Sequence, residues 1–128
     1  MAKKKILVVD DEPDFLELLK IRLEASNYDV ITALTGKEAL DKLKKEKPEA
    51  VLLDILMPEM DGLETLKVIR QDYKDLPVFI ITAFSNEERF KVANQLNASG
   101  FIVKTSDLKD EVERITGVLH LADKYKNK

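Results

Sequence analysis

The chain has 128 residues, and its 21 lysines and arginines against 24 aspartates and glutamates give a formal net charge of −3. It contains no cysteine, which excludes a disulfide framework, a thiolate nucleophile and a cysteine zinc site. A chain of this length is typical of one compact domain with its own core. The acidic balance argues against direct binding of nucleic acid or of an anionic membrane.

The N-terminal segment is the only part of the sequence that resembles a targeting signal. Three lysines are followed by four apolar residues, Ile6 to Val9, before Asp10 ends the run. This run is shorter than the apolar part of a signal peptide. No segment approaches the ~20 apolar residues that a membrane-spanning helix requires. We therefore expect a cytoplasmic protein without a membrane partner.

Five short apolar runs are typical of strands. Four of them are nearly unbroken in apolar character, which favours strands buried on both faces, as in a parallel sheet. The second run is more polar and fits the edge of a sheet. The five runs are Lys5 to Val9, Tyr28 to Ala33, Ala50 to Leu53, Val78 to Thr82 and Phe101 to Val103.

Amphipathic segments alternate with these runs and predict helices. Thr35, Asp61 and Ser85 each stand three residues before a glutamate, the spacing of a helix-capping box. Strict alternation of strand and helix implies right-handed crossovers with helices on both faces of the sheet. The sequence therefore predicts a doubly wound α/β domain with a five-stranded parallel sheet and five helices. Apolar residues recur at helical intervals at Phe15, Leu19, Leu23, Ala39, Leu40, Leu43, Leu63, Leu66, Ile69, Leu108, Val112, Ile115 and Leu119, with a thinner stripe at Phe90, Ala93 and Leu96.

Polar residues follow four of the five predicted strands. Ligands of open α/β sheets gather beyond the carboxyl ends of the strands, where the sequence has Asp10, Asp11, Asp54, Thr82 and Lys104. Two carboxylates about 4 Å apart repel by roughly 4 kcal/mol at an effective dielectric of ~20. Lys104 offsets one of three negative charges, so the excess predicts a divalent cation. Mg²⁺ with carboxylates, a hydroxyl and an ammonium forms a site suited to phosphoryl groups.

Four segments in this order and at these intervals resemble the receiver domain of two-component response regulators. They are Ile6 to Glu12, Leu52 to Gly62, Ile81 to Ala83 and Gly100 to Lys104. The resemblance runs from about residue 4 to residue 120. It implies the strand order 2-1-3-4-5 and a single receiver domain over residues 1–128, similar to the chemotaxis regulators, with a polar tail at residues 121–128.

The resemblance implies that Asp54 is the phosphoacceptor. Its carboxylate would attack the phosphorus of a phosphohistidine on a histidine kinase or a histidine phosphotransfer protein, which gives an aspartyl phosphate. Four groups would hold Mg²⁺: Asp11 directly, Asp10 through water, Asp54 itself, and the backbone carbonyl of Leu56.

The resemblance also implies a switch. Lys104 would contact one phosphoryl oxygen and the Thr82 hydroxyl would donate to another. As Thr82 moves, Phe101 would turn inward and reshape the face formed by the fourth helix, the fifth strand and the fifth helix. That face would bind a downstream protein target, and the protein would be a monomer or a weak phosphorylation-dependent dimer.

Several positions depart from the usual pattern of the family. The lysine is usually followed by a proline in cis, but Thr105 follows Lys104 here. A cis bond before a residue other than proline costs about 2.5–4 kcal/mol, so we expect the Lys104–Thr105 bond to be trans. Asn97 replaces a frequent glycine and tolerates a left-handed helix cap. Leu56 and Phe84 occupy positions that tune phosphate lifetime, and we expect these apolar side chains to shield the acyl phosphate from water.

Other functions stay open at this point. A phosphatase of the haloacid dehalogenase type also uses aspartate, threonine or serine, lysine and Mg²⁺ at strand ends. That family has its nucleophile on the first strand with a second aspartate two residues later, where this chain has Glu12. A degenerate receiver would bind partners without phosphorylation. We expect a signalling domain whose only chemistry is its own phosphorylation and slow dephosphorylation, either as a stand-alone protein or as part of a larger regulator.

Overall fold

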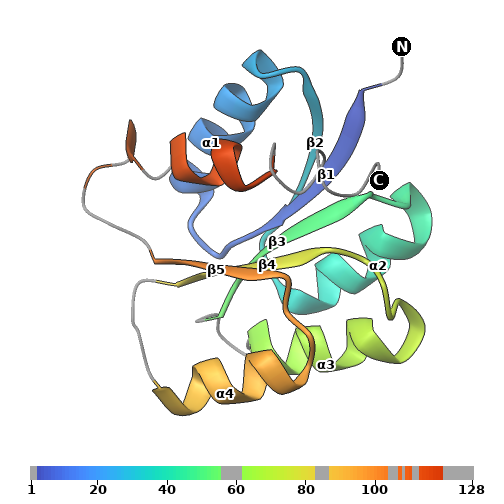
Figure 1. Cartoon of the computed structure of the whole chain (residues 1–128). Coiled ribbons are helices and arrows are strands. Elements are labelled where there is room, and N and C mark those ends of the chain that lie inside the picture. Colours follow the sequence, from blue (N-terminus) through green and yellow to red (C-terminus); the bar gives the residue numbers. More distant parts are fainter. Residues whose placement is uncertain are drawn as a thin grey trace, which may run out of the picture.

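The sheet has five parallel strands in the order β2-β1-β3-β4-β5 (Figure 1). This computed structural model describes residues 3–55, 62–82, 87–103, 107, 109–110 and 113–119. The order and the parallel pairing confirm the predicted doubly wound α/β fold. The strands are β1 (Lys4–Val9), β2 (Tyr28–Ala33), β3 (Ala50–Asp54), β4 (Val78–Thr82) and β5 (Gly100–Val103).

Helices cover both faces of the sheet. The helix α1 and the helical residues 113–119 lie on one face, and α2, α3 and α4 lie on the other (Figure 1). The helices that connect the strands are α1 (Pro13–Ala25), α2 (Gly36–Glu46), α3 (Gly62–Asp72) and α4 (Glu87–Gln95).

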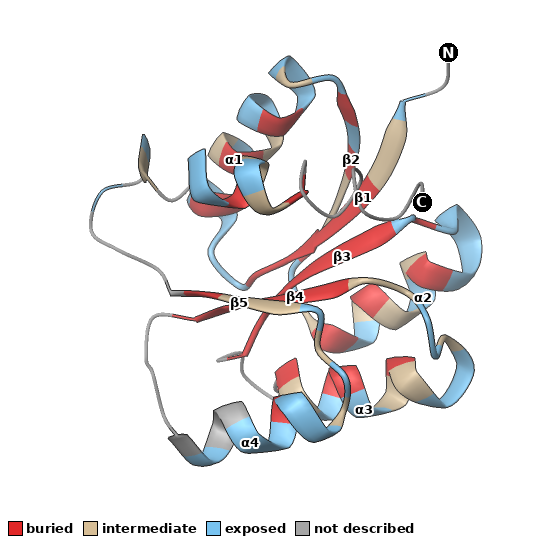
Figure 2. Ribbon diagram, in the orientation of Figure 1, coloured by how far each residue is buried: buried red, intermediate tan, exposed pale blue. Residues whose placement is uncertain are grey.

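Each strand sends alternate side chains into two apolar layers. On β1, Ile6 and Val8 pack in the layer beneath α1, whereas Leu7 and Val9 pack in the layer beneath α2 and α3. Figure 2 shows the central strands almost wholly in the colour of buried residues. At the edge, β2 exposes Asp29, as its more polar sequence predicts. Burial on both faces therefore accounts for the unbroken apolar runs of the central strands.

The predicted helix faces are confirmed where the structure describes them. On α1, Leu19 and Leu23 are fully buried, and on α3 Leu66 and Ile69 are fully buried. On α4, Ala93 is fully buried and Leu96 just after the helix is partly buried, whereas the burial of Phe90, the third residue of the predicted stripe, is not described. Burying one such leucine or isoleucine side chain stabilises a fold by about 1.5–3 kcal/mol.

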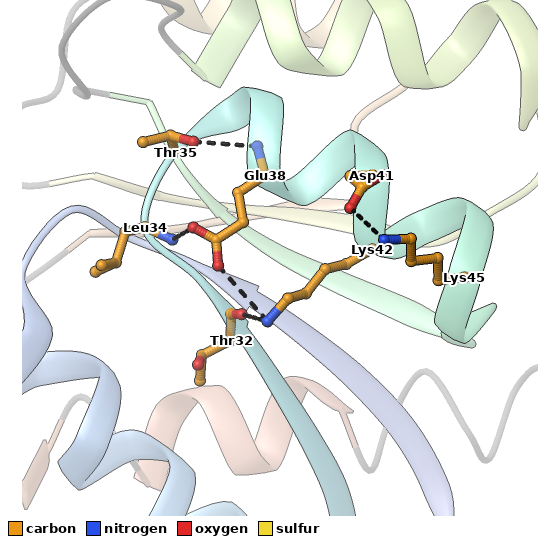
Figure 3. A network of polar contacts seen from close by, with 7 residues as sticks. All are labelled: Thr32, Leu34, Thr35, Glu38, Asp41, Lys42 and Lys45. Carbon is orange, nitrogen blue, oxygen red and sulfur yellow. Dashed lines mark hydrogen bonds and ion pairs between the residues drawn. The ribbon is translucent and has the colours of Figure 1, made fainter.

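Thr35 caps the start of α2, as predicted, and Glu38 reaches back to the residue before the cap (Figure 3). The Thr35 hydroxyl accepts a hydrogen bond from the Glu38 N–H at 3.1 Å, and the Glu38 carboxylate accepts one from the Leu34 N–H at 3.3 Å. Lys42 pairs with Glu38 at 3.5 Å and donates to the Thr32 carbonyl at 2.8 Å, which ties α2 back to β2. The caps predicted at residues 61 and 85 lie outside the described residues.

The structure extends one predicted strand and confirms one predicted turn. The prediction ended the third strand at Leu53, but β3 continues through Asp54 because that residue pairs with Ile81 on β4. Asn97 has a φ of 58°, so it forms the left-handed turn after α4 that its sequence position predicts.

Candidate functional site at the carboxyl ends of β1, β3 and β4

Three buried polar side chains lie where three adjacent strands end. Asp10 follows β1, Asp54 ends β3 and Thr82 ends β4, and they are 1%, 4% and 1% exposed, respectively. Together with Thr65 on α3, they are the buried polar or charged residues in the part of the chain that the structure describes. Burial of polar groups costs free energy and is concentrated at functional sites. This edge of the sheet is therefore the candidate site.

The ladder register brings the two buried aspartates side by side. The β1–β3 ladder ends with the pair Val9 and Leu53, so the next residues on the two strands are Asp10 and Asp54. Thr82 ends the strand on the other side of β3. Because neighbouring strands lie about 4.8 Å apart, all three side chains start from close backbone positions.

The loop after β1 folds back on Asp10. The Asp10 N–H donates to the carbonyl of Ala33 at 3.1 Å, and its carboxylate Oδ1 accepts the Glu12 N–H at 2.9 Å. The second contact is an Asx turn, a local bond that fixes the direction of a short loop. It holds the acidic residues of this loop next to one another before Pro13 starts α1.

Three carboxylates of this loop form a cluster with the donor spacing of a metal site. Oxygen atoms of Asp10, Asp11 and Glu12 all lie within 4.8 Å of one another, with Asp10 buried and the other two exposed. Such carboxylates repel by roughly 3–4 kcal/mol per pair at an effective dielectric of ~20, and less where water screens them. Hard oxygen donors of this kind suit Mg²⁺. Sequence reasoning did not include Glu12, although its place in the acidic run was the available signal.

The two predicted switch residues lie on adjacent strands. Phe101 on β5 is opposite Ile80 on β4, and Thr82 is two residues further along β4. The Phe101 ring is half-buried and packs against the apolar layer that faces α2, α3 and α4. Its position is intermediate between core and surface.

Several predicted site residues lie outside the described residues. They are Leu56, Phe84, Lys104 and the Lys104–Thr105 peptide bond. Of the predicted set, the structure places Asp10, Asp54 and Thr82 at the ends of adjacent strands and clusters Asp11 with Asp10, whereas Asp54 is not part of that acidic cluster.

A comparison with protein-family models decides the family. The model described as the response regulator receiver domain matches residues 6–116. The chain belongs to the response regulator receiver domain family. It is a receiver domain of a response regulator, a signalling protein of two-component systems. This membership is inconsistent with the dehalogenase-type phosphatase that the sequence left open.

Two transcriptional regulators have similar sequence identity to this chain. The receiver domain is 38% identical over 120 residues to the alkaline phosphatase synthesis transcriptional regulatory protein PhoP of Bacillus subtilis, covering 94% of this chain and 50% of PhoP. It is 40% identical over 124 residues to the probable transcriptional regulator ycf27 of Porphyridium aerugineum, covering 97% of this chain and 51% of that protein. The chain thus spans about half the length of these relatives.

Solved structures agree with the fold. A CheY-like receiver domain protein from Methanospirillum hungatei superposes with a TM-score of 0.84 at 29% identity, covering 96% of this chain and 98% of that chain. The response regulator TrrA from Thermotoga maritima, in complex with Mg²⁺ and BeF, superposes with a TM-score of 0.77 at 37% identity, covering 89% of this chain and 97% of that chain.

Among the described helices, none has the length and apolar character needed to cross a membrane.

Proposed function

We propose that Asp54 accepts a phosphoryl group from a phosphohistidine and that Asp10, Asp11 and the backbone carbonyl of Leu56 hold Mg²⁺ beside it. The observation that carries this proposal is the burial of Asp54 next to Asp10, at the strand end beside the acidic cluster. A buried carboxylate is shielded from water on most sides. This shielding favours its attack on a bound phosphorus and disfavours hydrolysis of the aspartyl phosphate that forms.

The proposed phosphoryl transfer is a single displacement at phosphorus. A carboxylate oxygen of Asp54 forms a bond to phosphorus while the bond from phosphorus to the imidazole nitrogen of the donor breaks. The electron pair of the broken bond stays on that nitrogen, which takes a proton from water. When bound, Mg²⁺ neutralises charge on the phosphoryl oxygens. We propose that the ammonium of Lys104 and the hydroxyl of Thr82 bind the remaining oxygens.

The acceptor is tested by incubating the protein with acetyl phosphate and Mg²⁺ and measuring its mass. We expect one added phosphoryl group on the wild type and none on Asp54→Ala. Asp29→Ala is the matched control, because Asp29 is an exposed aspartate on the edge strand, and it should be phosphorylated as the wild type is. Continuous hydrolysis of phosphate esters would point to a phosphatase instead. Absence of modification would point to a degenerate receiver.

We further propose that phosphorylation acts through Thr82 and Phe101 on the surface made by α4, β5 and the helical residues 113–119. The partners are a histidine kinase or phosphotransfer protein upstream and a protein target downstream, with no direct contact to nucleic acid from these residues. In support, the Phe101 side chain is half-buried and lies on the strand beside Thr82. A partly exposed side chain needs less free energy to move than a fully buried one.

The switch is tested by nuclear magnetic resonance with and without phosphorylation. Thr82→Ser keeps a hydroxyl and should preserve the phosphorylation-dependent shifts of β5 signals. Thr82→Ala should lose most of these shifts although Asp54 is still modified. Equal chemical-shift changes in the two variants would show that the Thr82 hydroxyl has no role in the switch. We also propose that Leu56 and Phe84 shield the aspartyl phosphate from water, so that the protein dephosphorylates itself slowly. The whole of residues 1–128 would form this single domain.

A further inference from the structure

The backbone beside the proposed phosphoacceptor is in direct contact with the first residue of α3. Gly62 is buried, and a Cβ built on it would overlap the carbonyl oxygen of Asp54 and lie 2.6 Å from Ile55 Cα and 2.8 Å from the Asp54 carbonyl carbon. All three of these atoms are backbone, so no side-chain rotation can relieve the overlap. Glycine is therefore the residue that lets α3 approach this peptide.

Ile55, the residue after Asp54, is held from two sides by hydrogen bonds. The Gly62 N–H donates to the carbonyl of Ile55 at 2.7 Å, and the Ile55 N–H donates to the carbonyl of Ile81 on β4 at 3.3 Å. The backbone that leaves Asp54 thus lies between α3 and β4. The first contact depends on the packing of α3 against the sheet, whereas the second continues the pairing of β3 with β4.

We propose that Gly62 is a positioning residue for phosphoryl transfer: its missing side chain lets α3 clamp the Asp54–Ile55 peptide and so set the direction of the Asp54 carboxylate. This inference rests on the proposed function of Asp54. A shift of this peptide would move the nucleophile relative to the acidic cluster around Asp10. Displacing a reacting group by 1 Å can cost about 100-fold in rate.

Two other glycines provide matched controls. A Cβ at Gly100 would lie 3.2 Å from the Phe79 ring, at the start of β5, which is the opposite end of the sheet from the site. A Cβ at Gly117 would meet nothing within 4 Å. Gly100→Ala therefore perturbs buried packing far from Asp54, and Gly117→Ala perturbs no packing.

The test compares these alanine variants under conditions where circular dichroism shows each of them folded. Two quantities are measured: the dissociation constant for Mg²⁺ alone, by calorimetry, and the rate of phosphorylation by acetyl phosphate. For Gly62→Ala we expect weaker Mg²⁺ binding and a rate lower by about 10–100-fold. Gly100→Ala and Gly117→Ala should stay within about twofold of the wild type, as expected for distant sites.

A second pair of variants keeps the inference testable if Gly62→Ala does not fold. Leu66 on α3 and Leu43 on α2 are both buried in the same apolar layer. Truncation of either leaves a cavity, but only Leu66→Ala loosens the helix that contacts Asp54. We expect Leu66→Ala to weaken Mg²⁺ binding and slow phosphorylation more than Leu43→Ala does.

Two results would overturn the inference in different ways. If the wild type is phosphorylated and Gly62→Ala matches it, or if Leu66→Ala and Leu43→Ala behave alike, only the positioning role of Gly62 is wrong. If the wild type takes up no phosphoryl group, the proposed function fails, and the inference that rests on it fails as well.

Discussion

The guanidinium of Arg70 donates a hydrogen bond to the carbonyl oxygen of Asn97 at 2.8 Å, which ties the end of α4 to α3. The same side chain donates to the carbonyls of Leu96 at 3.0 Å and of Tyr73 and Leu76 at 2.8 Å each. These carbonyls follow the last turns of the two helices, where backbone acceptors lack helical partners and the helix dipole is negative. One cation therefore caps two helix ends.

Arg70 makes these four hydrogen bonds although burial disfavours its charge. Burial lowers the pKa of the guanidinium, and the negative charge of Asp75 opposes this shift. The guanidinium nevertheless stays protonated at neutral pH because the ordinary pKa of arginine is far above 7. The charge is thus available for all four hydrogen bonds.

We expect Arg70→Gln to lower the free energy of unfolding by about 2 kcal/mol, since hydrogen bonds from a charged donor to partly buried carbonyls are lost. Arg70→Lys should recover only part of this loss, because a single ammonium cannot span the four acceptors. Urea denaturation measures both variants. Lys67→Gln, on the exposed side of the same helix, should change stability by less than about 0.5 kcal/mol. A similar loss in Lys67→Gln and Arg70→Gln would contradict this account of the clamp.

The left-handed residue after α2 offers a stabilising substitution. Lys47 has a φ of 51° and donates its N–H to the Leu43 carbonyl, the geometry of a helix C-cap that glycine adopts without a Cβ clash. We expect Lys47→Gly to raise stability by about 0.5–1 kcal/mol. Lys44→Gly, inside the helix, should instead lower it by about 1 kcal/mol. Thermal unfolding of the two variants checks the opposite signs, and a loss in both would refute the explanation.

The Thr35 side-chain cap of α2 should be worth about 1 kcal/mol. Thr35→Ala removes the acceptor for the Glu38 N–H, whereas Thr35→Ser keeps a hydroxyl at the same place. The alanine variant is therefore expected to unfold at lower urea concentration than the serine variant. If the two have the same midpoint, the hydroxyl contributes nothing to the helix start.

The acidic cluster should destabilise the metal-free protein. Asp11 lies within 4.8 Å of two other carboxylates, so Asp11→Asn relieves repulsion and should stabilise the metal-free protein by about 0.5–1 kcal/mol. That gain corresponds to a rise of roughly 2–4 °C in the unfolding temperature. Added Mg²⁺ should raise the unfolding temperature of the wild type more than that of the variant.

The exposed aspartate of β2 supplies the control for this measurement. Asp29→Asn removes the same charge away from the cluster and should show little change with or without Mg²⁺. An unfolding temperature of Asp11→Asn that is no higher than that of Asp29→Asn would mean that the cluster stores no repulsion.

The sequence alone was sufficient for features that depend on near neighbours. The apolar runs predicted the strands, and the spacing of Thr35 and Glu38 predicted a cap that the hydrogen bond confirms. Asn97 was expected to form a left-handed turn, and its φ agrees. These features involve hydrogen bonds and periodicities within about four residues, so a linear pattern contains them. The order of the acidic residues also indicated the carboxyl edge of the sheet.

Only the tertiary structure decided which distant residues touch at that edge. The sequence placed Gly62 only next to the helix cap predicted at Asp61, but its contact with the Asp54 backbone exists because α3 packs against that strand end. In the same way, Arg70 reaches Asn97 across 27 positions of the chain. No local pattern encodes such contacts, since they depend on how the whole sheet packs its helices rather than on the residues beside them.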